Sequence, residues 1–231
     1  METTHNACAR ALGITFSNPK YLEQALTHRS YINEHRNYTG GHNERLEFLG
    51  DAVLELVVTE HLFANYDNPE GELTAWRAAL VNTDMLARVA TDLGITRYLR
   101  MGRGEARGEN MRARHHILAN TVEAIIGAIH LDQGYDAAKR FITRTILIHL
   151  DEILNKKLYR DPKSYFQELA QRHRGITPHY EILEERGPDH DREFVAGVYI
   201  GDELITHGVG RSKQDAQRAA AQAAREHLGW E

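Results

Sequence analysis

Residues 43–55 read NERLEFLGDAVLE, and this stretch decides the fold of the first half of the chain. Its apolar residues recur at the spacing of one buried helical stripe. Glu44, Glu47 and Asp51 lie at i, i+3 and i+7, so at roughly 100° per residue their carboxylates fall on one side of the helix. Like charges this close destabilise a helix by roughly 0.2–0.5 kcal/mol per pair. An acidic face is usually a solvated surface, but the pattern also suits a site that uses the charge.

Gly50 stands in the middle of the same predicted helix, beside Asp51. Glycine inside a helix is about 1 kcal/mol less favourable than alanine. Its presence there favours the close approach of another group to the helix backbone. We therefore expect the acidic stretch to lie against a second element.

A second helix is predicted for ILANTVEAIIGAIHLD, residues 117–132. The segment is almost entirely apolar, yet Asn120 and Glu123 share one face at i, i+3. Buried polar groups need partners. Either Glu123 is hydrogen-bonded within the core, or it faces the acidic helix and shares a cation with it. Mg²⁺ prefers oxygen ligands of this kind, and the spacing alone leaves both readings open.

Composition sets broad limits. The 231 residues suffice for one large or two modest domains. The single cysteine excludes an internal disulfide and fits a reducing cytosol. No secretory signal or apolar run of membrane-spanning length is evident, so we expect a cytoplasmic protein without a membrane partner. The net charge of −5 argues against a basic nucleic-acid-binding surface as a whole.

The chain changes character near residues 151–160. Before this point the pattern is helical, with a mobile loop expected at 101–116; after it, one helix, three short strands and a second helix follow. The predicted fold class is an all-α domain followed by a small α+β (α-β-β-β-α) domain, with both helices on one face of the sheet. The predicted divisions are 1–152, a linker at 153–160, and 161–231.

The acidic stretch resembles the defining segment of bacterial ribonuclease III. LTHRSY (26–31), PEGELTAWRAALVN (69–82), ILANTVEAIIGAIHLD (117–132) and SKQDAQRAAAQAA (212–224) also fit that family, in order along nearly the whole chain. The second half resembles a double-stranded RNA-binding domain.

The resemblance implies a homodimer of endonuclease domains that cleaves double-stranded RNA with Mg²⁺, for which Mn²⁺ is a possible substitute. It implies 5′-phosphate and 3′-hydroxyl staggered ends, and structured rRNA and mRNA precursors as substrates. By position it assigns four metal ligands, of which Asp51 and Glu123 are also catalytic, one outer acid that acts through water or through contacts with the ligands, and one aromatic residue at the dimer interface. These are Glu47, Asp51, Asn120 and Glu123 as ligands, Glu44 as the outer acid, and Phe48 at the interface. Spacing alone would favour a core position for Phe48.

Asn120 departs from the family, which has aspartate there. An asparagine oxygen can ligate Mg²⁺ but brings no negative charge and cannot accept a proton from water. The change is compatible with a working natural variant, with a site retuned towards Mn²⁺, or with an inactive or weakened double-stranded RNA-binding protein. His116, where a small hydroxyl residue is usual, is interpreted as a surface histidine.

The resemblance places duplex contacts on the first helix of the second domain, a strand-connecting loop and the start of the last helix. Residues 161–231 hold nine basic and thirteen acidic residues, a net charge of −4. We therefore expect weak, salt-sensitive binding by this domain alone. The implied RNA-binding residues are Gln167, Glu168, His190, Arg211, Ser212, Lys213, Gln214 and Gln217.

Overall fold

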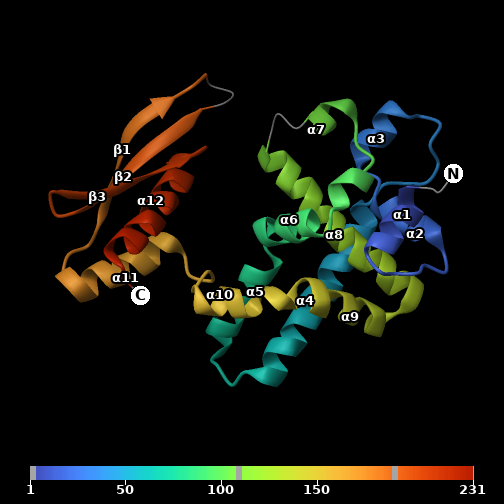
Figure 1. The fold of residues 1–231 in the computed structure, drawn as a ribbon, viewed down its shortest axis with the longest axis horizontal. Helices are drawn as coiled ribbons and strands as arrows, with labels where there is room; N and C mark the ends of the chain where they lie inside the picture. Colours follow the sequence, from blue (N-terminus) through green and yellow to red (C-terminus); the bar gives the residue numbers. More distant parts are fainter. Residues whose placement is uncertain (1–3, 108–110, 189–191, 231) are drawn as a thin grey trace. The chain divides into compact units, whose positions relative to one another are not determined.

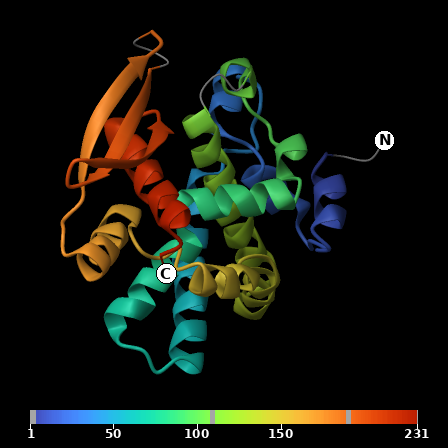
Figure 2. The same cartoon turned by 60° about the vertical axis from the view of Figure 1, so that its left-hand side comes forward.

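The computed structural model describes residues 4–107, 111–188 and 192–230. The chain separates into two compact units, Met1–Tyr159 and Arg160–Glu231 (Figures 1 and 2). The first is helical and the second is α+β, which confirms the predicted fold class. None of the helices in these ranges combines the length and apolar character of a membrane span.

The first unit is a bundle of helices, drawn in blue to yellow in Figure 1. Short 3₁₀ turns, η1 and η2, interrupt it at Ile95–Tyr98 and Leu147–His149. The α-helices are α1 (Thr4–Ala11), α2 (Pro19–Ala25), α3 (Arg29–Glu34), α4 (Glu44–Asn65), α5 (Glu70–Val81), α6 (Thr83–Asp92), α7 (Arg103–Arg107), α8 (Met111–Gln133), α9 (Tyr135–Thr145) and α10 (Leu150–Asn155).

Two glycines allow α4 and α8 to cross in backbone contact. A Cβ atom added at Gly50 would lie 1.7 Å from the carbonyl oxygen of Glu123, and one added at Gly127 would lie 2.2 Å from that of Leu46. No larger residue fits at either position without moving a helix. The crossing confirms the close approach that Gly50 predicts, and it buries the central residues of α8, including Ile125 and Ile126, completely.

Two segments differ from their predictions. The first is 101–116, where α7 and the start of α8 occupy most of the expected loop. Backbone N–H groups of Gly102 and Arg103 donate to Ser30 Oγ and Glu34 Oε1, each at 2.8 Å, so α3 caps the start of α7. These caps come from residues about 70 positions earlier, which local glycine content does not reveal.

The second is AAKRFITRTILIHLDEIL, residues 137–154, whose spacing predicts one continuous amphipathic helix. It breaks at Ile146, where α9 ends and η2 begins. The break changes the direction in which the following side chains point. Leu147, Leu150 and Ile153 then face the core, where all three are buried. Ile153 also lies within the predicted linker, so α10 extends the first unit beyond the predicted boundary.

The second unit is a three-stranded antiparallel sheet in the order β1-β2-β3 with two helices. The buried alanines of α12 face β3 closely: a Cβ atom at Gly208 would lie 2.1 Å from the Ala220 nitrogen. Small residues on both elements therefore let helix and sheet pack without a gap. The elements are α11 (Pro162–Arg174), β1 (His179–Arg186), β2 (Glu193–Ile200), β3 (Glu203–Gly210) and α12 (Lys213–Leu228).

The α4–α8 crossing predicts a large cost for one methyl group. Gly50→Ala forces the helices apart, and we expect it to lower the free energy of unfolding by about 3 kcal/mol. Gly71→Ala, in α5 with open space around the added carbon, is the matched control and should be neutral or slightly stabilising. Urea unfolding followed by circular dichroism measures both; equal stabilities would contradict the close crossing.

Candidate active site

The crossing brings the predicted acidic residues together. Burial is the main cause that raises the pKa of Glu47, and the negative charges of Glu44 and Asp51 raise it further. A hydrogen bond from the Asn120 amide acts in the opposite direction and lowers this pKa. Burial also raises the pKa of Glu123 to about 8, with repulsion from Asp51 and Glu47 contributing. Glu123 therefore faces the acidic helix. Of the two readings that the sequence left open, this one is correct as to orientation.

Glu44 lies apart from these inner residues, at the exposed start of α4. Its carboxylate is 3.5 Å from Arg29 Nη1 and 3.7 Å from His42 Nδ1. Two basic side chains thus surround the outermost acid, whereas no cation is seen against the inner acids in the described residues. Sequence spacing does not associate Arg29 or His42 with Glu44, because their proximity depends on how α3 and the segment before α4 pack.

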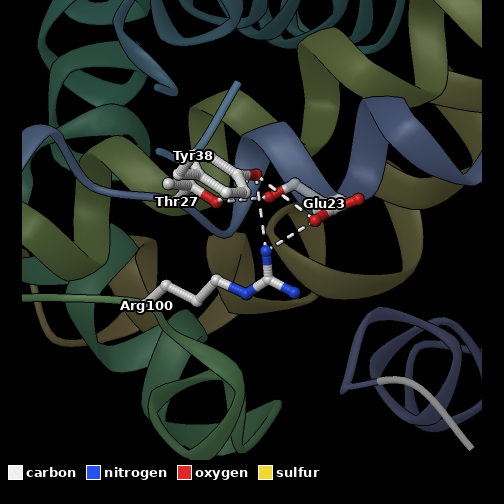
Figure 3. Close-up of polar contacts among 4 residues, drawn as sticks. All are labelled: Glu23, Thr27, Tyr38 and Arg100. Carbon is white, nitrogen blue, oxygen red and sulfur yellow. Dashed lines mark hydrogen bonds and ion pairs between the residues drawn. The ribbon is translucent and has the colours of Figure 1, made fainter. Parts of the chain in front are cut away.

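A polar network holds the chain just before α4 (Figure 3). Arg100 Nη1 donates to Glu23 Oε1 at 2.6 Å and to the Tyr38 hydroxyl at 3.3 Å. The Tyr38 hydroxyl also lies 3.3 Å from Thr27 Oγ1. The hydrogen bond from Arg100 is the main reason that the pKa of Glu23 lies below its usual value. The network joins α2, the loop preceding α4 and the segment after η1.

Backbone bonds carry this arrangement to the acidic helix. The Arg100 N–H donates to the Leu26 carbonyl and the His28 N–H to the Arg100 carbonyl, both at 2.9 Å. The Asn43 N–H donates to the Thr27 carbonyl at 3.0 Å. Asn43 precedes α4 directly, so these bonds fix where the acidic helix begins.

Phe48 lies on the outer side of α4 with 83% of its surface exposed. A core position within its own subunit, which spacing alone would favour, is therefore wrong. Phe63, near the end of the same helix, is 81% exposed. It borders a hollow of about 550 Å³ formed by the end of α4 and the start of α5, with Leu62, Tyr66 and Leu73 among its lining.

The predicted RNA-binding residues of the second unit lie on α11 and at the start of α12. Ser212 caps α12, because its hydroxyl accepts the Asp215 N–H at 3.1 Å. Glu168 pairs with Arg160, and Gln217 accepts a bond of 2.7 Å from Lys163. His190 lies outside the described residues. Gln167, Arg211, Lys213 and Gln214 are exposed.

Comparison with known proteins agrees with this geometry. Residues 18–150 match a family model described as Ribonuclease-III-like, and residues 162–228 match the double-stranded RNA binding motif. Curated relatives called Ribonuclease 3, from Desulforamulus reducens and Geobacillus kaustophilus, are 45% and 47% identical to this chain. The alignments cover 96% and 94% of this chain, and 91% and 88% of theirs.

This chain belongs to the ribonuclease III family. The solved nuclease domain of ribonuclease III from Campylobacter jejuni is 39% identical, with a TM-score of 0.53 over 60% of this chain and 93% of that one. The ribonuclease III domain followed by the RNA-binding motif defines an endoribonuclease specific for double-stranded RNA.

The donor chemistry of the ribonuclease III site fits a hard divalent cation. Glu47, Asp51, Asn120 and Glu123 offer carboxylate and amide oxygens, the ligands that Mg²⁺ prefers, and their mutual repulsion would be relieved by positive charge. In the described part of the chain, no three His, Cys, Asp or Glu side chains are already arranged to hold a metal ion.

The raised pKa of Glu123 predicts a pH-dependent stability in the metal-free protein. Because the folded-state pKa of about 8 exceeds the ordinary value of 4.5, the folded state holds the proton more tightly. The resulting stabilisation is complete below the unfolded-state pKa and is lost as the pH rises through about 8. Relative to Glu123→Gln, we expect the wild type to lose about 2 kcal/mol between pH 5 and 8.5. Urea unfolding of both proteins in chelator measures this; a constant difference would contradict it.

Proposed function

We propose that this chain is a homodimeric endoribonuclease that hydrolyses phosphodiesters in both strands of duplex RNA. The observation that carries the proposal is the meeting of α4 and α8 carboxylates in a chain that also has a duplex-RNA-binding domain. Glu47, Asp51, Asn120 and Glu123 would hold the cation, and Glu44 would act from outside this group. A cytoplasmic location, with structured rRNA and mRNA precursors as substrates, completes the proposal.

When bound, Mg²⁺, or Mn²⁺ in its place, would activate water for attack on phosphorus and stabilise charge on the leaving 3′-oxygen. Asp51 and Glu123 would orient that water, and one of the two carboxylates, in its ionised form, would accept the proton that the water loses. Transfer of this proton to the departing 3′-oxygen would leave a 3′-hydroxyl on one fragment and a 5′-phosphate on the other.

The homodimer is supported by the surface of α4. Phe48 and Phe63 are 15 residues apart on one helix, so they lie about 22 Å apart and about 60° around its axis. A two-fold interface requires each surface feature to meet its complement on the other copy. We propose that Phe48 of each copy packs into the hollow beside Phe63 of the other. The Campylobacter jejuni nuclease domain also has a region involved in dimer formation.

Phe48→Ala should convert the dimer to a monomer at micromolar concentration, because it removes the main apolar anchor of the interface. Ile148→Ala is the matched control, since Ile148 is 63% exposed on η2 and should leave the dimer intact. Size-exclusion chromatography with light scattering measures both. A Phe48→Ala protein that stays dimeric at the wild-type concentration would contradict this packing.

Asn120 supports a second candidate function, a duplex-RNA-binding protein with weak or no cleavage. Its amide satisfies the Glu47 carboxylate without a metal ion and contributes no charge to attract one. Asn120→Asp adds a fourth negative group to Glu47, Asp51 and Glu123. We therefore expect it to lower the Mg²⁺ concentration for half-maximal cleavage at least about tenfold, since each added charge strengthens cation binding.

Cleavage of a long RNA duplex across a series of Mg²⁺ and Mn²⁺ concentrations tests both functions. Asn65→Asp, an exposed substitution on α4, is the matched control and should change nothing. Metal-dependent cutting by the wild type supports the nuclease. Duplex binding without cutting, together with activity in the Asn120→Asp variant, supports the second function. Binding without cutting by either protein would overturn the nuclease proposal.

A further inference from the structure

The lysine at the start of α12 already has an anionic partner within its own domain. Lys213 Nζ lies 2.9 Å from Glu185 Oε1, at the end of β1. The same ammonium group lies 5.6 Å from the ring centroid of Phe194, which pairs with Glu185 across β1 and β2. The strand register therefore places the carboxylate beneath the first turn of α12.

Glu185 engages a second cation at the same time. Its other oxygen, Oε2, lies 3.4 Å from Arg192 Nη1. The hydrogen bond from Lys213 is the largest cause that holds the pKa of Glu185 below its usual value. The charges of Lys213 and Arg192 also contribute. One ionised carboxylate thus joins two basic side chains.

Two other ion pairs of this domain lie away from the start of α12. Arg174 pairs with Glu203 at 2.7 Å, and Arg186 pairs with Glu184. Lys213 differs because it follows the Ser212 cap, where the free N–H groups of a helix favour an anion. A phosphate reaching this end of α12 meets a lysine whose charge is already compensated.

We propose that Glu185 lowers the affinity of this domain for duplex RNA. In the free protein its carboxylate pairs with the Lys213 ammonium group, which an RNA phosphate would otherwise contact. The inference rests on the proposed function, because it assigns Lys213 to duplex binding. Binding then exchanges one anion for another at Lys213, and the domain gains less than it would from a free lysine. Both side chains of the pair are partly exposed, so the exchange needs no unfolding.

Salt dependence follows from the same exchange. A free lysine that neutralises a phosphate releases about one counterion from the duplex. When Lys213 must first leave Glu185, the freed carboxylate attracts a cation from solution, so the net release falls. Glu185→Gln should therefore steepen the dependence of affinity on salt by about one unit of log K against log [salt].

The test measures binding of the full-length dimer to a fluorescently labelled 24-base-pair RNA duplex in chelator, from 50 to 250 mM KCl. We expect Glu185→Gln to bind about three- to tenfold more tightly at the lowest salt, with the advantage shrinking as salt rises. Glu184→Gln removes the same charge from the next residue of β1 and should stay within about twofold of the wild type.

A double-mutant cycle separates the specific pair from general charge. Lys213→Met should weaken binding little in the wild type and strongly in the Glu185→Gln background. Equal gains from Glu185→Gln and Glu184→Gln, or additive effects of Lys213→Met, would overturn the inference. Mg²⁺-dependent cleavage by the same preparations reports the proposed function separately. A Glu185→Gln protein that cleaves the duplex but binds it no more tightly overturns this inference alone, whereas loss of duplex binding and cleavage in every variant overturns both.

Discussion

The contact of two helix backbones at Gly50 and Gly127 is the constraint on which the active site depends. At this crossing the carbonyl oxygen of Glu123 occupies the space where a side chain of residue 50 would begin. The residue after Gly50 is Asp51, so its carboxylate and that of Glu123 emerge on the same side of the contact. A wider crossing would separate the acids and remove both their repulsion and their ability to share a cation.

The same contact explains how the fold tolerates the repulsion. Completely buried side chains such as Leu54, Ile125 and Ile126 surround the crossing, and each contributes roughly 1.5–3 kcal/mol of apolar burial. The mutual repulsion of the acids is small beside this sum. Burial, with the repulsion from Asp51 and Glu47 added to it, raises the pKa of Glu123 to about 8, and a bound cation would replace the proton that Glu123 then holds. The cluster of acids is therefore unfavourable on its own and would become favourable if a cation entered it.

Much of this could be predicted from sequence because it depends on helical period. The spacing of Glu44, Glu47 and Asp51, the position of Gly50, and the shared face of Asn120 and Glu123 are all local properties. Features set by tertiary contacts could not be predicted. The caps on α7 come from Ser30 and Glu34, and the break at Ile146 follows from which residues the core can accept. Phe48 shows the limit most clearly, since its spacing fits the core, whereas the structure exposes it and only the family resemblance indicated a position outside the core.

Charge distribution links the two units functionally. The net charge is −5 overall and −4 in residues 161–231, so neither unit attracts the RNA backbone from a distance through net charge. Recognition must instead come from local groups such as the start of α12, and there Glu185 already reduces the available charge. Catalysis meets a similar condition, because the acids that would hold the cation repel phosphate until the cation is present. Under the proposed function, each step would therefore need an exchange of ionic partners at a defined side chain, at Lys213 for binding and at Glu123 for chemistry. Such a chain would depend on salt and on divalent cations more strongly than a basic nuclease, since bulk attraction would not compensate when either exchange fails.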